Sequence, residues 1–436
     1  MTNSRGALIL GANYRALGIA RSLGRRGIET WLLHDPGDDQ VTRASRYVGR
    51  TLRAPQGNPE QRRHGLLAIA SRHGLAGWTL FPTGDESAAM IARGHAALGE
   101  HFALTSPSWD VFRYAHHKRL THLVAQRAGT EHPWTRHPLT RTDVAALACE
   151  FPLILKPEVK PEENEFTRAK AWRVDDRASL LGAWDAATEL VAPEAVMIQE
   201  LIPASGAAQY SFAALCRDGV PLASLVARRT RQYPRDFGHS SSLVETVHAP
   251  RVEASGRAIL RSLGWNGLVE IELMHDVRDD SLKLLDINGR VWTWHSLGPR
   301  AGVDFPYLAW RLSQGLPVEP VRAQPGVRWM RAATDVPSAL GAVRAGELTL
   351  GGWLRSVRGP REPALFAADD PLPALLDPFI LAWRLMLRRT GWPQSLGTTE
   401  DGCEAVARGE LVPESPPDGS MLQYVAIHPR KDWNLP

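Results

Sequence analysis

The sequence predicts a multidomain protein that combines α/β and α+β parts. Residues 7–35 alternate strand, helix and strand, which is typical of the opening of a parallel α/β sheet. Residues 151–290 hold several apolar strands, intervening helical stretches and a closing hairpin at 267–290. Beyond Pro317 prolines are frequent and the periodicity weakens. With 436 residues, the chain is long enough for two to four domains.

The composition is that of a soluble globular protein. Apolar residues make up 44% and charged residues 22%, and the net charge of +4 is spread without a basic block that would favour nucleic-acid binding. Cys149, Cys216 and Cys403 show no CxxC pairing, so neither a disulfide framework nor a structural zinc site is indicated. We find no signal-peptide layout and no long apolar span. We therefore expect a cytoplasmic protein with no stable membrane insertion.

The first strand, 7–10, is followed by a helical pattern over 16–26 and a second strand that ends at Asp35. Gly11 and Gly18 are in place for a nucleotide-binding turn, but the middle glycine of GxGxxG is missing. We therefore interpret the glycines as a tight scaffold turn; in the dinucleotide alternative, Asp35 binds the ribose. The strand at 79–87 ends in polar residues, at the edge where open α/β sheets place ligands.

The middle of the chain places lysines and polar residues at strand ends. Lys118 lies in a helical stretch, 109–128, and Lys156 closes an apolar strand, 151–157. A lysine at a strand end beside a cleft is a suitable point charge for phosphate, although its amine could simply reach solvent. Further elements are expected at 170–174 (strand), 179–189 (helix), 195–203 (strand), 209–232 (two strands), 251–263 (helix) and 376–389 (helix).

The hairpin at 267–290 carries acids on one face. Side chains alternate along a strand, so Glu270 and Glu272 share a face. If the hairpin folds about Asp279, Glu272 lies opposite Asp286 and Glu270 lies opposite Asn288. Like charges directly opposite each other destabilise a sheet, and oxygen ligands of this kind suit Mg²⁺ bound together with phosphates. The alternative is an ordinary solvated sheet face.

The order of these residues resembles the ATP-grasp superfamily, over residues 6–316, and most closely its predicted carboxylate–amine ligases. The residues that carry the resemblance are Lys118, Lys156, Gln199–Glu200, Glu272, Asp286, Asn288 and Arg290. It implies a Rossmann-like N-terminal domain followed by a two-subdomain ATP-grasp fold. The expected division is 1–113 (Rossmann-like domain), 114–194 (first subdomain, with a phosphate lid), 195–316 (second subdomain, with the Mg²⁺ and ATP site) and 317–436 (C-terminal extension).

The resemblance also implies site residues. Lys118 and Lys156 correspond to phosphate-contacting lysines, and Gln199, Glu200, Leu201 and Ile202 correspond to the segment that holds adenine. Lys170, in the loop after Lys156, is a further expected cofactor contact. Glu272, Asp286 and Asn288 correspond to Mg²⁺ ligands. Arg290 corresponds to the cation near the transferred phosphoryl group. Lys156 and, from the arginine-rich segment 227–241, Arg231 are the other expected catalytic cations. The implied cofactors are ATP and two Mg²⁺ ions, which Mn²⁺ can replace.

Two features depart from the family pattern. The loop after Lys156 lacks the glycines that many ATP-grasp proteins use to cover phosphates, and offers Lys160 and Lys170 instead. Asp286 stands where the family commonly has Glu, and Gly289 stands where Pro is frequent. The shorter acid changes the reach of the ligand but keeps its chemistry.

Two neighbouring segments offer substrate contacts. Residues 227–241 contain four arginines; Arg229 and Arg231 are expected to share a face, and Arg228 to point away. Arginine pairs bidentately with carboxylates and phosphates, so this pair is a candidate for substrate binding. After the hairpin, Trp292, Trp294, His295 and Arg300 are weaker candidates, because such tryptophans and histidines more often belong to the core.

The expected activity is an ATP-dependent ligation of a carboxylate to an amine through an acyl phosphate, with release of ADP and phosphate. The expected partners are a small-molecule carboxylate and an amine, and a homodimer is possible. Three alternatives remain open: an ATP-grasp enzyme that uses bicarbonate, a non-catalytic nucleotide-binding protein, and a nicotinamide oxidoreductase built on the N-terminal unit. The sequence does not indicate which carboxylate or amine is used.

Overall fold

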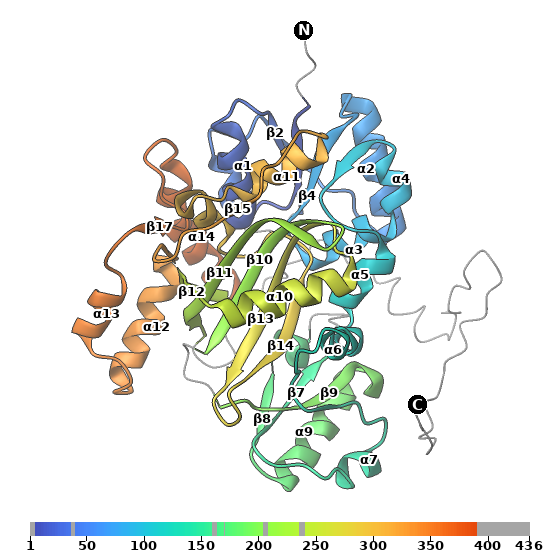
Figure 1. The fold of residues 1–436 in the computed structure, drawn as a ribbon, viewed down its shortest axis with the longest axis vertical. Coiled ribbons are helices and arrows are strands. Elements are labelled where there is room, and N and C mark those ends of the chain that lie inside the picture. Colours follow the sequence, from blue (N-terminus) through green and yellow to red (C-terminus); the bar gives the residue numbers. More distant parts are fainter. Residues whose placement is uncertain are drawn as a thin grey trace, which may run out of the picture.

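The structure, a computed structural model, describes residues 5–35, 40–158, 164–169, 171–203, 208–234 and 240–389, which form three sheets (Figure 1). The N-terminal sheet is parallel, with strand order β3-β2-β1-β4-β5. Its elements are β1 (Ala7–Leu10), α1 (Tyr14–Gly24), β2 (Thr30–His34), β3 (Arg50–Arg53), α2 (Pro59–His73), β4 (Trp78–Pro82), α3 (Asp85–Arg93), α4 (His95–Gly99) and β5 (Phe102–Leu104).

The turn between β1 and α1 has the tight geometry expected of its glycine. Gly11 has a φ of +120°, and an added Cβ would lie 2.1 Å from Oγ1 of Thr83. Asn13 caps α1 by accepting a hydrogen bond from the backbone of Arg15, which satisfies one of the unpaired N–H groups at a helix start. The predicted strand–helix–strand order over 7–35 is confirmed.

A small antiparallel sheet of order β6-β9-β7-β8 lies at the end of the molecule away from the N-terminal sheet (Figure 1). Its buried side chains, among them Leu155, Trp184 and Ile198, form a separate core. The elements of this region are β6 (Thr135–Arg136), α7 (Arg141–Ala145), β7 (Leu153–Pro157), α8 (Glu165–Arg168), β8 (Trp172–Val174), α9 (Arg177–Leu190) and β9 (Val196–Glu200). The two helices that precede them, α5 (Trp109–His116) and α6 (Lys118–Arg127), belong to a different core, which includes Phe112 and Val124.

The largest sheet has the order β14-β13-β10-β11-β12-β16-β17, with β15 beside β11. One face packs on α10, and Val269, Ile271 and Leu273 belong to that core. The other face is apolar where Ala213 and Leu225 pack toward α1, and polar near the end of β14. The elements are β10 (Gln209–Arg217), β11 (Val220–Tyr233), β12 (Ser240–Thr246), α10 (Pro250–Leu263), β13 (Gly267–Asp276), β14 (Ser281–Asn288), α11 (Phe305–Ser313), β15 (Val321–Arg322), β16 (Arg328–Met330) and β17 (Arg361–Pro363).

The predicted register of the β13–β14 hairpin is confirmed at its open end. Glu272 pairs with Asp286, and Glu270 pairs with Asn288. Nearer the turn, a β-bulge shifts the register, so that Leu273 pairs with Leu284. A bulge adds one residue to one strand and thereby changes which face the following side chains take.

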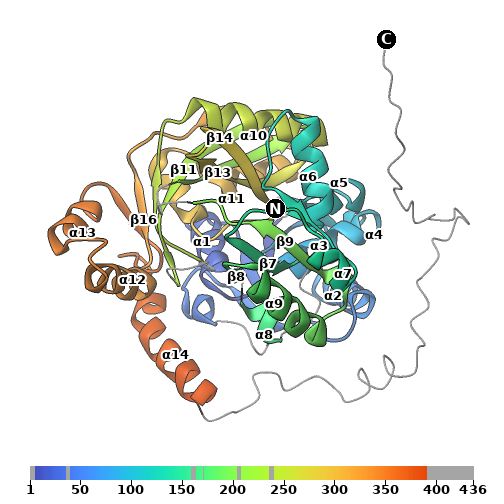
Figure 2. The ribbon, with the colours of Figure 1, turned by 90° about the horizontal axis from the view of Figure 1, so that it is seen from below.

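The segment after α11 adds α12 (Ala332–Arg344), α13 (Leu350–Ser356) and α14 (Leu372–Arg389), seen beside the large sheet in Figure 2. The helix predicted from residue 376 begins earlier, at Leu372, because Pro373 falls in its first turn, where a proline is tolerated. Asp370 accepts hydrogen bonds from Arg21 at 2.9 Å and from Ser45 at 2.7 Å, which ties this segment to the N-terminal sheet. Among the described helices, none is long and apolar enough to cross a membrane.

Candidate functional site

The open end of the hairpin gathers acids and amides on one face of the large sheet. The amide of Asn288 donates to Glu270 Oε2 and to Glu272 Oε1, both at 3.1 Å. Gln209, on the neighbouring strand β10, donates to Glu272 Oε2 at 2.7 Å, and Nη2 of Arg229 lies 3.4 Å from Glu272 Oε1. We call Glu270, Glu272, Asp286 and Asn288 the acid cluster.

Glu270 is the buried acid of the acid cluster. Its side chain is buried, and within the described chain no hydrogen-bond partner contacts its Oε1. Burial and the neighbouring charge of Glu272 raise the pKa of Glu270 to about 7. Beside it lies Arg229, two of whose donors, Nε and Nη1, are buried without a hydrogen-bond partner in the described part of the protein. Such groups destabilise the free protein unless a ligand satisfies them.

The two predicted phosphate lysines come from different elements. Lys118, the first residue of α6, forms an ion pair with Asp286 and so brings a predicted phosphate contact directly to a predicted metal ligand. Lys156, on β7, donates to Oε1 of Gln199 at 2.9 Å. Gln199 in turn donates to Thr135 at 2.9 Å, which fixes its amide and therefore the direction of Lys156. Lys160 and Lys170 lie outside the described residues.

The acid cluster fits Mg²⁺ only if the ion arrives with other oxygen ligands. Across the described ranges, no three His, Cys, Asp or Glu side chains are arranged to hold a metal ion. Mg²⁺ in nucleotide sites is commonly bound by one or two carboxylates together with substrate phosphates, which matches the facing pair Glu272 and Asp286. Lys118 supplies positive charge to Asp286 in the free protein. The amide of Asn288 faces the acids and its Oδ1 accepts from Arg290 at 3.2 Å, so here Asn288 orients its neighbours.

Arg290 follows the end of the hairpin and contacts the start of α3, the helix after strand β4 of the N-terminal sheet. Its guanidinium forms a bidentate pair with Asp85, at 2.7 and 3.1 Å. The preceding Gly289 has a steric reason for being glycine, because an added Cβ would lie 2.5 Å from Phe112 and 2.9 Å from Trp265. The departure from the family's frequent proline therefore reflects close packing against α5 and Trp265.

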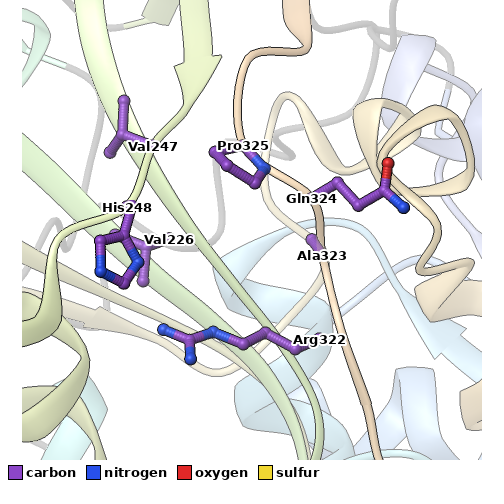
Figure 3. Close-up of a pocket in the computed structure, with 7 residues that line it drawn as sticks. All are labelled: Val226, Val247, His248, Arg322, Ala323, Gln324 and Pro325. Atoms are coloured by element: carbon purple, nitrogen blue, oxygen red, sulfur yellow. The ribbon is translucent and has the colours of Figure 1, made fainter.

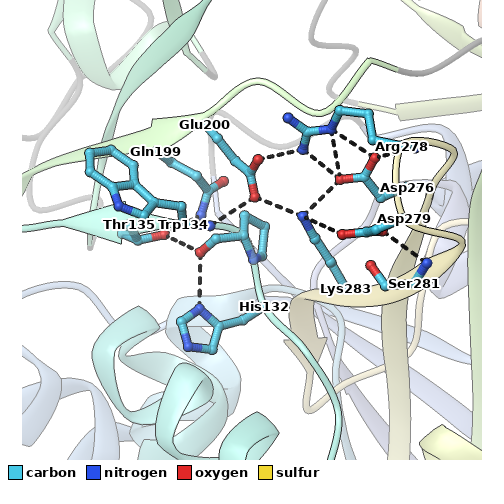
Figure 4. A network of polar contacts seen from close by, with 11 residues as sticks. His132, Trp134, Thr135, Gln199, Glu200, Asp276, Arg278, Asp279, Ser281 and Lys283 are labelled. Carbon is cyan, nitrogen blue, oxygen red and sulfur yellow. Dashed lines mark hydrogen bonds and ion pairs between the residues drawn. The ribbon is translucent and has the colours of Figure 1, made fainter. Parts of the chain in front are cut away.

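Glu200 belongs to a network of hydrogen bonds and ion pairs at the other end of the hairpin (Figure 4). Its carboxylate accepts from the backbone of Trp134 at 2.9 Å, from Lys283 at 3.0 Å and from Arg278. Lys283 also donates to Asp276 at 2.7 Å. The bulge in β14 explains why Lys283 is here: it pairs with Met274 instead of His275, which turns its side chain to the face of the acid cluster.

The segment that is predicted to hold adenine, Gln199–Ile202, makes several contacts within the protein. The N–H of Leu201 donates to the carbonyl of Pro152 at 3.1 Å, so that group is already engaged. Ile202 is buried and Gln199 serves Lys156, as described above. Glu200 is the residue of this segment whose side chain reaches the hairpin, where its carboxylate accepts a hydrogen bond from Lys283.

The prediction that Arg229 and Arg231 share a face is wrong. The β11–β12 register shifts between them, so Arg229 pairs with Val244 while Arg231 pairs with its neighbour Leu243. Adjacent positions point to opposite faces, and Arg231 accordingly contacts Asp335 at 2.8 and 2.9 Å. Arg229 alone of the two contacts the acid cluster.

The weaker substrate candidates lie away from the acid cluster. Trp292 and Trp294 are buried in the core that joins the large sheet to α1. His295 Nε2 donates to the carbonyl of Arg15 at 2.9 Å, and burial lowers the pKa of His295 to about 4, which makes it a neutral structural residue at neutral pH. Arg300 is exposed. These positions agree with the core interpretation of the two tryptophans and the histidine.

Several residues of the site were missed in the sequence. Gln209 and Asp85 are polar residues near strand ends, and nothing else in the surrounding sequence marks them as site residues. The position of Lys283 on this face depends on the bulge in β14, which the sequence does not reveal. A cavity of about 270 Å³ beside β11 and β12 was not expected either (Figure 3). Its lining, which includes His248 and Arg322, shares no residue with the acid cluster.

Comparisons with known proteins support the fold. No family model and no curated protein matches the chain. The L-amino acid ligase of Bacillus licheniformis is similar in structure, with 16% identity, coverage of 73% of this chain and 76% of that chain, and a TM-score of 0.55. N5-carboxyaminoimidazole synthetase of Staphylococcus aureus gives 13% identity, 74% and 80% coverage, and a TM-score of 0.55.

A third similar structure contains a nucleotide. The biotin carboxylase domain of the 2-oxoglutarate carboxylase of Hydrogenobacter thermophilus, in complex with MgADP, ADP and bicarbonate, gives 13% identity, coverage of 74% of this chain and 73% of that chain, and a TM-score of 0.58. At these identities the likeness concerns the fold. The neighbours are ATP-grasp enzymes, and the chain has the ATP-grasp fold.

Proposed function

We propose that the protein is an ATP-dependent carboxylate–amine ligase that forms an amide bond and releases ADP and phosphate. The observation that carries this proposal is the facing pair of Glu272 and Asp286, with Lys118 ion-paired to Asp286. Two acids opposite each other beside a third, buried acid, Glu270, would destabilise a sheet that had only a structural role. A triphosphate with Mg²⁺ would bring a cation to the facing acids and anionic oxygens to Lys118 and Lys156.

The nucleotide is assigned to the space between the small sheet and the acid cluster. Lys156 and Lys118 are the proposed phosphate contacts, and Glu200 is the proposed contact at the nucleoside end. Glu272 and Asp286 would hold Mg²⁺, which supplies charge neutralisation to the phosphate oxygens. We assign residues 1–113 to the Rossmann-like domain, 114–194 and 195–316 to the two ATP-grasp subdomains, and 317–436 to the C-terminal extension.

The chemistry needs positioning and charge neutralisation more than proton transfer. A carboxylate oxygen of the substrate attacks the γ-phosphorus, the bond to the bridging oxygen breaks, and ADP leaves. An unprotonated amine then attacks the acyl carbon, phosphate leaves with the bonding electrons, and the nitrogen releases one proton. Lys118, Lys156 and Arg290 hold the phosphoryl oxygens, and Arg229, with two unpaired nitrogens, is placed to receive the substrate or the departing phosphate.

The fold also accommodates an enzyme that activates bicarbonate, since similar structures include biotin carboxylase and N5-carboxyaminoimidazole synthetase. The test is ADP release by the purified protein with MgATP, supplied in turn with bicarbonate, with a panel of carboxylates plus amines, and with neither. The ligase proposal expects ADP release that depends on a carboxylate and an amine, with an amide product detected by mass. Dependence on bicarbonate instead, or no ATP binding at all, would contradict it.

A further inference from the structure

A cavity of about 380 Å³ lies where three parts of the protein meet. It is bounded by the end of the N-terminal sheet and α4, by α11, and by the last residue of β10, Arg217, and the first residue of β13, Gly267. Its volume is within the range of small-molecule sites, which begins at about 300 Å³. None of the described residues that line it belongs to the acid cluster, so the cavity is separate from the proposed nucleotide site.

Hydrogen bonds hold the walls of this cavity in place. The backbone N–H of Leu268 donates to the carbonyl of Thr105 at 3.1 Å, which joins the start of β13 to the segment after β5. The hydroxyls of Ser313 on α11 and Thr79 on β4 are 2.9 Å apart. An added Cβ on Gly267 would clash with the carbonyl oxygen of Thr105, so this close approach requires glycine. The cavity is therefore a preformed space between elements that are tied to each other.

The lining combines apolar walls with an unsatisfied hydroxyl. Phe102 and Leu215 are buried, and Leu312 adds to the apolar surface. Ser106 is 5% exposed, and its Oγ has no hydrogen-bond partner in the described part of the protein. A buried hydroxyl without a partner destabilises the free protein, and a ligand that accepts a hydrogen bond from it would remove this penalty.

The charge at the cavity is positive. Arg217 is exposed, and among the described residues it forms no ion pair. His95 Nε2 donates to the carbonyl of Ser106 at 3.2 Å. Asp218, the neighbour of Arg217, accepts from the amide of Asn266 at 3.1 Å, and no acidic side chain is among the described residues that line the cavity. Apolar walls with donors and a cation fit an anion that has an apolar body.

We propose that this cavity binds a small monocarboxylate with an apolar body, such as a medium-chain or aryl-substituted acid. The guanidinium of Arg217 pairs with the carboxylate, and the hydroxyl of Ser106 donates to one of its oxygens. Phe102, Leu215 and Leu312 contact the apolar body. The bound acid would join the end of the N-terminal sheet to the large sheet. The site does not depend on the ligase function, because no residue that we assign to ATP, Mg²⁺ or the phosphoryl group lines the cavity.

The test is calorimetric titration of hexanoate and phenylacetate, and of their uncharged amides, into the full chain. We expect at least one of the two acids to bind. Its amide should bind about tenfold more weakly or worse, because it lacks the charge that pairs with Arg217. Arg217→Gln should weaken binding of the acid by a similar factor, and thermal unfolding checks that this variant folds.

Ser106→Ala distinguishes a hydroxyl that binds a ligand from one that only supports the fold. Binding of the acid should become weaker by about fivefold or more, because the ligand loses a donor. The melting temperature of the free variant should equal or exceed that of the wild type, because the hydroxyl has no hydrogen bond to lose in the described part of the protein. A lower melting temperature with unchanged binding would assign Ser106 to the fold alone and contradict the proposal.

Arg261→Gln is the matched control. Arg261 is also an exposed arginine, on α10, and it does not line the cavity, so binding of the acid should be unchanged. The proposal is wrong if neither acid binds, if the amides bind as tightly as the acids, or if Arg217→Gln or Ser106→Ala changes the affinity less than twofold. An equal loss of affinity in Arg261→Gln would also contradict it, because the acid would then respond to surface charge in general.

Discussion

The two ends of the β13–β14 hairpin place acids on the same face of the same sheet but pair them differently. Near the turn, Asp276 and Glu200 share Lys283 and Arg278, and each carboxylate has at least two donors. At the open end, Glu270 has an unpaired oxygen, and Glu272 faces Asp286 across the strands. The difference indicates that the turn end is organised for stability and the open end for a ligand that brings its own charge.

The largest expected effect on stability is at the turn end. Lys283→Met should lower the free energy of unfolding by about 3 kcal/mol, because it leaves two carboxylates in a largely buried network with Arg278 as their remaining cation. Urea unfolding followed by circular dichroism measures the change. A loss below about 1 kcal/mol would mean that the turn network is not what holds this end together.

The open end should show the opposite behaviour. Glu272→Gln is expected to slow ADP release on the order of 100-fold, because a charge that positions the phosphates is lost. Its melting temperature should be equal to or above that of the wild type, because the variant removes the repulsion that raises the pKa of Glu270. Asp279→Asn, at a turn side chain that is 49% exposed, is the matched control and should change neither quantity. A destabilised Glu272→Gln would mean that this acid is structural.

Acid sensitivity should come from the turn end. Hydrogen bonds from Arg278 and Lys283 hold the pKa of Asp276 well below its ordinary value near 4. A depressed carboxylate pKa contributes stability that is fully present above the ordinary value and is lost as the pH falls toward the folded one. Urea midpoints measured from neutral pH down through about pH 3 should therefore fall for the wild type and fall less for Lys283→Met. If the urea midpoints of the wild type and of Lys283→Met fall equally with pH, Asp276 is not the source of the acid sensitivity.

The smallest effect is expected for Arg278→Gln. The arginine contacts both Glu200 and Asp276 but its side chain is 43% exposed, and solvent screens such pairs. The free energy of unfolding should change by at most about 1 kcal/mol. The same unfolding assay decides this, and a loss as large as that of Lys283→Met would show that the two cations act as one unit.

The sequence was sufficient for features that depend on local periodicity. Alternation along the strands predicted that Glu272 faces Asp286, and the βαβ pattern predicted the opening of the parallel sheet. The features that it could not predict arise from bulges and from contacts between distant segments. A single extra residue in β11 separated Arg231 from Arg229, and another in β14 brought Lys283 to the cluster face. The Asp85–Arg290 pair joins residues 205 positions apart.

The claim that the open end of the hairpin binds a metal–nucleotide complex is tested most directly by calorimetric titration of ATP into the wild type, Glu272→Gln and Asp279→Asn, each with and without Mg²⁺. We expect Mg²⁺ to strengthen ATP binding to the wild type and to Asp279→Asn. In Glu272→Gln the increase in ATP affinity that Mg²⁺ causes should be smaller by about tenfold or more. If Mg²⁺ increases the ATP affinity of all three proteins equally, or if the wild type does not bind ATP, the open end of the hairpin is not a metal–nucleotide site.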